Sequence, residues 1–317
     1  MSDFLKLIKR MGIQRKYIFL LILRSPFDAF RTWMLAGMMK FTFLCLETDD
    51  TGRLLAVCII YGLICALLFF YNGTIWGIYA AFSAPIEAWL QRMMLEKILD
   101  LPFKRVDSYF SGEWITKLNS DIQTAFMMMN GPLNIPHAVV AIINTMLSSF
   151  LIVRSSFLFF VVTWVFILPY LFINYKIVLR HMPKLKEESQ KAMAESTSAI
   201  KPLITEAETI LLYDASDLMM KKCDESSRKL MKINLNMHML NALSSGVFQL
   251  FGIGGYLVML LIGYNFIYNG VMSFSDVVYC FQVRGSILAG MFMLMTCLSN
   301  IKANSVCIKR INDIFEE

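Results

Sequence analysis

The stretch that decides the fold is LLAVCIIYGLICALLFFYNGTIWGIYAAF, which runs from Leu54 to Phe82 without a charged residue. A bilayer core is about 30 Å thick, so a helix needs about 20 apolar residues to cross it. Beyond Phe82, apolar residues continue to recur at spacings of three and four as far as Ile98, which is typical of a helix. We therefore expect one helix from Leu54 to about Leu99, roughly 70 Å long and over twice the bilayer core.

The composition of the whole chain agrees with a membrane protein. Of its residues, 57% are hydrophobic and 17% are charged, and the mean hydropathy is +0.56. Soluble domains are about 45–50% apolar and about 25% charged. The seven cysteines are scattered and form no C-x-x-C, so we expect neither a disulfide framework nor a metal site. The net charge of +6 does not indicate nucleic acid, because the basic residues are sorted by loop.

Apolar stretches of sufficient length predict an all-α integral membrane fold with six long spanning helices. The six expected spans are Tyr17–Leu46, Leu54–Phe82, Pro132–Val153, Phe157–Ile177, Leu243–Ile267 and Phe274–Leu298. We expect spans two to five to extend into the cytoplasm as a helical stalk. Ahead of them, Asp3–Met11 has apolar residues on one side and basic residues opposite. This pattern predicts an amphipathic elbow helix within residues 1–14 that lies on the inner membrane surface, although an ordinary basic flank would also produce it.

The basic residues predict the orientation of the chain. Three short links join the spans in pairs, at residues 47–53, 154–156 and 268–273, and of the 30 lysines and arginines only Arg53 and Arg154 lie there. Four more lie inside spans, namely Arg24, Arg31, Lys40 and Arg284. All the others lie on the opposite side, which the positive-inside rule places in the cytoplasm. We therefore expect a multi-pass protein of the plasma membrane with both termini cytoplasmic.

A segment between the second and third spans resembles a known family. It reads LPFKRVDSYFSGE over residues 101–113 and continues through Lys117-Leu118 to Asp121-Ile122. It is similar to L-P-x-x-[FY]-F-D-x-x-x-x-G-E-x-x-x-[RK]-[LV]-x-x-D-[IV], the first intracellular loop of ABC exporter membrane domains. Arg105-Val106 stand where two aromatic residues usually precede the aspartate. On local pattern alone, a plain helix–turn–helix with Asp107 as an N-cap is the alternative.

Three further segments resemble the same family in the expected order. ETILLYDA at residues 208–215 is similar to the second-loop pattern E-T-I-K-x-[YF]-x-A, with Leu211 for lysine. NGVMSFSDVV at 269–278 resembles the beginning of the sixth helix, with Ser275 for glycine. IKRINDIFE at 308–316 resembles the stretch before the nucleotide-binding domain. The resemblance covers nearly the whole chain, and its E-T-I pattern is similar to that of peptide and bacteriocin exporters.

The resemblance implies a six-helix exporter domain over residues 15–317, with intracellular loops at about 83–131 and 178–240. In this family each loop carries a short coupling helix that docks on an ATPase domain. The implied coupling residues are Arg105, Val106, Asp107, Tyr109, Gly112, Glu113, Glu208, Thr209, Ile210, Leu212 and Tyr213. The implied partners are a nucleotide-binding domain that carries ATP and Mg²⁺, a second membrane domain of the same or a related kind, and the lipid bilayer.

The sequence contains no G-x-x-x-x-G-K-[ST] loop that would cradle ATP phosphates, and no L-S-G-G-Q signature. We therefore expect no nucleotide-binding domain, no catalytic site and no cofactor in this chain. A separate polypeptide would supply the ATPase, or the chain is an isolated membrane domain. ATP hydrolysis would belong to the assembled transporter only.

Charged and polar residues inside spans are costly and mark candidate substrate contacts. By family geometry the sixth helix lines the pathway, so we predict contacts from Arg284 and Gln282, with Asn144 and Thr145 lining the cavity or bonding across helices. Arg24, Asp28 and Arg31 are spaced for a self-paired cluster, and Pro26 allows a kink beside them. Lys40 is expected to snorkel toward the interface.

The leading hypothesis is thus the membrane subunit of an ATP-driven exporter, acting as a homodimer or heterodimer. The alternative is a degenerate member of the family that serves as a non-transporting scaffold, receptor or immunity protein. A secondary transporter or channel would need carboxylates buried within the spans, and Asp28 is nearly the only one. The sequence pattern does not identify the transported substrate.

Overall fold

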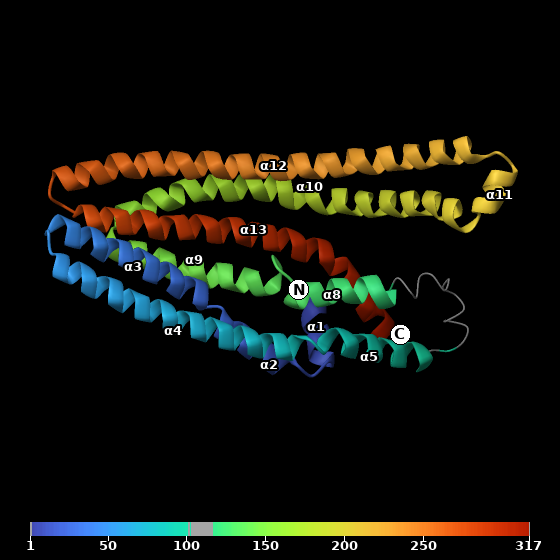
Figure 1. Cartoon of the computed structure of the whole chain (residues 1–317), viewed down its shortest axis with the longest axis horizontal. Helices are drawn as coiled ribbons and strands as arrows, with labels where there is room; N and C mark the ends of the chain where they lie inside the picture. The colour runs from blue at the N-terminus through green and yellow to red at the C-terminus, as the bar shows by residue number, and fades with distance from the viewer. Residues whose placement is uncertain (1, 101, 103–116, 317) are drawn as a thin grey trace. The chain divides into compact units, whose positions relative to one another are not determined.

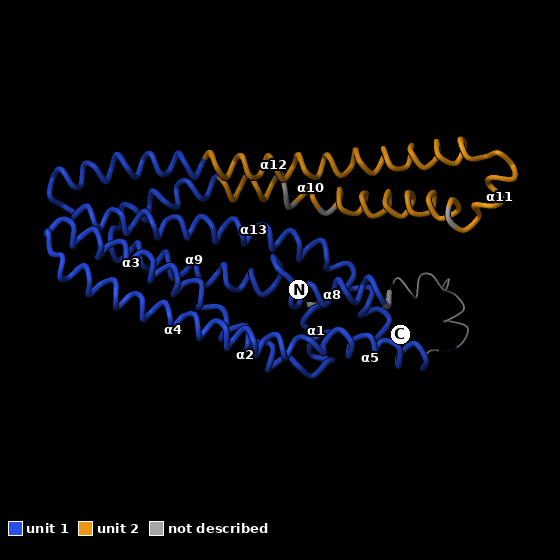
Figure 2. Tube along the Cα trace, viewed as in Figure 1, with its two compact units in different colours: residues 1–169, 251–317 blue, residues 170–250 orange. Residues whose placement is uncertain are grey.

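The computed structural model describes residues 2–100, 102 and 117–316, and over these residues the chain is helical, with no strand. Five of the described helical stretches are long and apolar enough to cross a membrane. The predicted all-α integral membrane fold is therefore confirmed. The described residues divide into two compact units, residues 1–169 with 251–317 and residues 170–250 (Figure 2).

Most of the described helices are labelled in Figure 1, and several extend well beyond the predicted spans. Their bounds are α1 Ser2–Arg10, α2 Gln14–Arg24, α3 Phe27–Glu47, α4 Thr51–Ser83, α5 Ile86–Asp100, η1 Lys117–Asp121, α8 Ile122–Asn130, α9 Ile135–Ser155, α10 Phe157–Thr205, α11 Ala207–Leu212, α12 Ser216–Tyr268 and α13 Phe274–Glu316. α10, α12 and α13 contain 49, 53 and 43 residues, about twice the number that a bilayer core requires. The last helix also extends well beyond the predicted span end at Leu298.

The first predicted span is two helices rather than one. α2 ends at Arg24 and α3 begins at Phe27, with Ser25 and Pro26 between them. Proline lacks a backbone N–H, so the kink that Pro26 allowed is a break here. α3 contacts α4, α9 and α13, but its charged residues lower its hydropathy and it is not among the five apolar candidates. A sixth membrane crossing therefore stays a prediction.

A second proline divides the long helix expected over Leu54–Leu99. α4 ends at Ser83 and α5 begins at Ile86, so Pro85 stands at the junction. The helical bonding resumes at once, because Ala84 N–H donates to Ala80 O and Trp89 N–H donates to Pro85 O, both at 2.9 Å. The predicted length is thus nearly correct, with one interruption where proline cannot donate.

The links at one end of the first unit are short and locally capped. Asp50 accepts a hydrogen bond from Arg53 N–H at 3.0 Å and so caps α4. Between α12 and α13, Gly270 adopts φ +67°, a conformation that glycine takes without strain. Glu47, at the end of α3, accepts from Ser275 N–H at 3.2 Å and satisfies a free donor in the first turn of α13.

The hydrophobic core of the first unit lies around α1. The predicted helix is present, but Phe4, Leu7, Ile8 and Met11 are at most 4% exposed and pack against α5, α8 and the end of α13. Only Leu5 of the apolar side is exposed. Protein therefore covers these four residues, and the position of α1 on the inner membrane surface stays a prediction.

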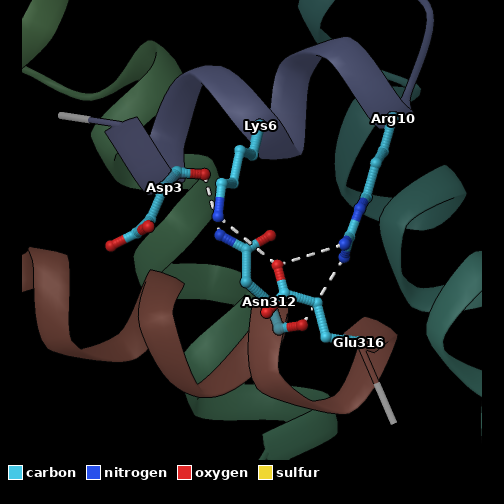
Figure 3. A network of polar contacts seen from close by, with 5 residues as sticks. All are labelled: Asp3, Lys6, Arg10, Asn312 and Glu316. Carbon is cyan, nitrogen blue, oxygen red and sulfur yellow. Dashed lines mark hydrogen bonds and ion pairs between the residues drawn. The ribbon is translucent and has the colours of Figure 1, made fainter.

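On the other face of α1, polar contacts also join this helix to the end of α13 (Figure 3). Asn312 Nδ2 donates to Asp3 O at 2.8 Å. Lys6 and Arg10 lie 3.5 Å and 3.4 Å from the Glu316 carboxylate. These partly exposed ion pairs contribute little individually, so apolar burial is the main force that joins α1 to α13.

The second unit, residues 170–250, consists of the last part of α10, all of α11 and the first part of α12. Lys229 and Glu195 form an ion pair at 2.6 Å, and Ser189 donates to Asn234 at 2.8 Å. Tyr170 packs edge-on against Phe248, with ring centroids 5.4 Å apart. The two helices of this unit are therefore held together by sparse contacts along their length.

Candidate functional site

The first group of predicted coupling residues, Arg105, Val106, Asp107, Tyr109, Gly112 and Glu113, lies outside the described residues. The described end of the same motif is Asp121, whose side chain is 2% exposed. Arg310 Nη2 donates to Asp121 Oδ1 at 2.7 Å. Asp121 and Arg310 come from two of the segments that carry the family resemblance, so this ion pair ties the first loop to the end of α13.

The second group of coupling residues lies on and beside α11, a six-residue helix. Ile210 is buried, with 7% of its surface exposed, while Glu208 and Thr209 are exposed. Leu212 and Tyr213 are 82% and 75% exposed. The backbone turns here, because Asp214 adopts φ 48° and Ala215 N–H donates to Ile210 O at 3.0 Å.

This segment exposes several large apolar side chains. Leu211, which replaces the lysine usual in the family, is 72% exposed as well. Three consecutive large apolar side chains therefore face away from the helix pair, while Ile210, the buried residue of α11, anchors the segment to it. Contiguous exposed apolar residues mark interaction sites in soluble regions.

A polar pocket of about 320 Å³ lies between α3, α9 and α13. Asn144 and Gln282, two predicted pathway residues, line it together with Asp28, Arg31 and Ser286. Asn144 Nδ2 donates to Ser286 Oγ at 2.9 Å, and Thr32 lies 3.0 Å from the same hydroxyl. Asp28 and Arg31 pair at 3.3 Å. The pocket therefore combines amide, hydroxyl and paired charged groups from the three helices α3, α9 and α13.

Thr145 and Arg284, the other two predicted pathway residues, face helix neighbours. Thr145 is 3% exposed, and a Cβ added at Gly290 would collide with its hydroxyl. Arg284 is fully buried, with its guanidinium carbon 4.2 Å from the ring centroid of Tyr256 and Nη2 2.9 Å from Gly252 O. A role in the pathway stays a prediction for both.

The predicted cluster of Arg24, Asp28 and Arg31 forms only in part. Arg31 pairs with Asp28, but the guanidinium of Arg24 lies 4.0 Å from the ring centroid of Trp76. Cation–π contact of this kind is stronger in a water-poor setting. The break at Pro26 separates Arg24 from the helix that carries the other two, which explains the different partner.

Sequence reasoning missed one intramembrane ion pair. Lys40 Nζ lies 2.6 Å from Asp276 Oδ1, so Lys40 does not simply snorkel. The available signal was opposite charge near one end of two expected spans, because Lys40 precedes the end of α3 by about two turns and Asp276 lies in the first turn of α13. Charged residues within spans usually pair with one another. As for metals, no group of three histidine, cysteine or acidic ligands occurs in the described ranges.

Comparison with known proteins assigns the family. The sequence profile of the ABC transporter transmembrane region matches residues 16–291, which is most of the chain. A comparison with curated protein sequences gives no match. The match begins after α1 and includes α11 and every residue that lines the polar pocket except Met293. The chain therefore belongs to the ABC transporter transmembrane family and is a multi-pass membrane subunit of an ABC transporter.

Proposed function

We propose that this chain is the membrane-spanning subunit of an ATP-driven exporter and couples to ATPase domains on another chain. ATP and Mg²⁺ would bind to those domains. The observation that carries this proposal is the exposed apolar segment at α11, at the position where the sequence resembles the second coupling loop of exporters. ATP can move a transporter only through its different affinity for two states, so a firm mechanical contact with the ATPase is required.

The structure of α11 suits such a contact. An isolated helix of six residues is not stable in water, and the buried side chain of Ile210 holds this one in place. Leu212 and Tyr213 are then presented outward with little of their surface covered. Burying a large apolar side chain at an interface contributes about 1.5–3 kcal/mol. Two such residues on a fixed turn would make an effective docking element.

The orientation of the exporter follows from the charge distribution. We propose that the links at residues 47–53, 154–156 and 268–273 face outward and that α11 and both termini lie in the cytoplasm of the plasma membrane. This orientation places α11 on the side where ATP is available. It also places the end of α13, together with α1, next to the expected ATPase.

A second membrane subunit is part of the proposal. On α12, Met231, Leu235 and Met239 are spaced by four residues and are 62%, 55% and 63% exposed. They lie on one face of the helix and precede the predicted span that begins at Leu243. An exposed apolar row on a water-accessible part of a helix favours a protein partner. We propose that a second copy or a related chain covers it.

The substrate pathway is proposed to include the polar pocket between α3, α9 and α13. Asn144 and Gln282, two of the residues suggested for the pathway, line this pocket. Polar groups at membrane depth usually face a cavity or one another. The hydrogen bonds between Asn144 and Ser286 meet this requirement. The same side chains offer donors and acceptors to a transported substrate.

The experiment is co-purification of the full chain with candidate ATPase chains, followed by ATP-dependent transport in vesicles. Leu212→Asp should weaken ATPase association by about tenfold or more, because it places a charge where an apolar side chain would be buried. The matched control is Met193→Asp, which changes a 62% exposed residue of α10 in the same unit. Equal binding by both variants, or no association with any ATPase, would contradict the proposal. Association without transport would favour the scaffold alternative.

A further inference from the structure

A second cavity, of about 720 Å³, lies between α3, α4, α9 and α13 in the first unit and is not the polar pocket described above. Its size is that of a small-molecule site. Its lining changes from charged at one end to apolar at the other, and one of its cations has no anionic partner within the described residues. These two features indicate which kind of ligand the cavity binds.

The polar end is formed by Lys40, Asp276 and Arg154. The ammonium of Lys40 pairs with Asp276 at 2.6 Å, and Asp276 also accepts from Ser273 Oγ at 2.8 Å. These two charges therefore satisfy each other. Arg154, in the last turn of α9, has no hydrogen bond or ion pair within the part of the chain that the structure describes. The polar end thus carries one cation in excess.

The apolar end lies deeper in the helix pair formed by α3 and α4. Phe30 and Trp33 line it from α3, and Leu68 lines it from α4. Ten residues separate Phe30 from Lys40 along α3, which corresponds to about 15 Å. Tyr61 also lines the cavity, and Gly37 allows this, because a Cβ at that position would meet the Tyr61 hydroxyl at 2.5 Å.

We propose that this cavity binds a single-tailed amphipathic anion, with its headgroup on Arg154 and its tail directed toward Trp33 and Leu68. An anionic headgroup gives the guanidinium a charged hydrogen-bond partner, which is the strongest kind that it can form. A cationic headgroup would be repelled by the excess positive charge. A tail of apolar groups fills the deeper end, whose lining is aromatic and aliphatic. This inference concerns binding and does not depend on coupling to an ATPase.

The test uses the full chain in nanodiscs of zwitterionic phosphatidylcholine and dodecanoate that carries a photoreactive group on its tail. Cross-linked peptides are identified by mass spectrometry, and the concentration for half-maximal labelling is measured. Labelling is expected on α3 and α4 near Trp33 and Leu68. Arg154→Gln should raise that concentration about tenfold or more, because a charged hydrogen bond is lost. Arg154→Lys, which keeps the charge, should retain most of the affinity.

Two controls separate headgroup from tail. Arg53→Gln removes an exposed arginine at the same end of the helices that pairs with Asp50 and does not line the cavity, so labelling should not change. Leu68→Trp fills the apolar end and should weaken labelling while the variant remains monodisperse. Unlabelled dodecanoate should compete with the probe, whereas acetate, which has no tail, should not. Equal labelling by Arg154→Gln and Arg53→Gln, or equal affinity for the corresponding alcohol, would overturn the proposal.

Discussion

Two tyrosine hydroxyls share one backbone carbonyl, and this arrangement predicts a strong coupling between them. α8 ends at Asn130, so its last carbonyl groups lack donors from the helix itself. Met129 O accepts from Tyr17 Oη at 2.8 Å and from Tyr79 Oη at 3.0 Å. The tyrosines are 3% and 2% exposed, so water does not replace a lost hydroxyl freely. Together they join α2 and α4 to the end of α8.

The perturbation is replacement by phenylalanine, which keeps the ring and removes only the hydroxyl. Tyr17→Phe or Tyr79→Phe alone should lower the free energy of unfolding by about 1 kcal/mol, because the other hydroxyl still satisfies the carbonyl. The double variant loses both bonds and leaves a buried acceptor without a donor, which costs about 1–3 kcal/mol more. The expected total is therefore about 3–5 kcal/mol, well above the sum of the single changes.

The assay is chemical denaturation of the purified chain in detergent micelles, followed by circular dichroism. Tyr175→Phe is the control, because Tyr175 is 67% exposed and the change should leave stability within about 0.5 kcal/mol. If the double variant equals the sum of the two single variants within about 0.5 kcal/mol, the shared carbonyl does not couple them and the reasoning is refuted.

Two further predictions concern the end of α13. Arg310→Gln should cost about 2–3 kcal/mol in the same denaturation assay, because it removes a cation that contacts the buried Asp121 carboxylate; the loss is below that of a fully buried pair, since the Arg310 side chain is 47% exposed. Adding Asp121→Asn should recover part of that loss, and no recovery would argue against the pair. Burial raises the pKa of the Cys307 thiol, although the Arg310 contact opposes this, so a polar maleimide should label a variant that retains only Cys223 and spare one that retains only Cys307. Labelling of Cys223 should require access to the cytoplasmic face, and labelling in intact cells would contradict the proposed orientation.

The helices were predictable because their signal is local. The uncharged run from Leu54 to Phe82 can satisfy its backbone in a bilayer only as a helix or within a closed barrel, and its length and continuity favour the helix. Pro26 separates α2 from α3 at the position where the sequence predicted a kink. This signal is also local, because the missing backbone N–H donor is a property of proline itself. Pro85 acts identically, although the periodicity around it gave no warning.

The candidate site was predictable only in part. Asn144 and Gln282 line a common pocket, while their place on a substrate pathway stays a prediction. Arg284 is also a polar residue within a predicted span, but it contacts Tyr256 on α12. The rotation of α13 about its axis decides which neighbouring helix each of its residues faces. The pairing of Lys40 with Asp276 likewise depends on which helices become neighbours.

The sequence by itself determined that the described residues are helical and where five apolar stretches long enough to span a membrane lie, since these depend on hydropathy and on backbone bonding within a segment. Tertiary structure alone decided what covers each face. The sequence showed that one side of α1 is apolar and predicted that the helix lies on the inner membrane surface, and only the approach of α5, α8 and α13 buried Phe4, Leu7, Ile8 and Met11 inside the protein. Amphipathicity shows that a surface must be covered, while the identity of the cover depends on contacts between residues hundreds of positions apart.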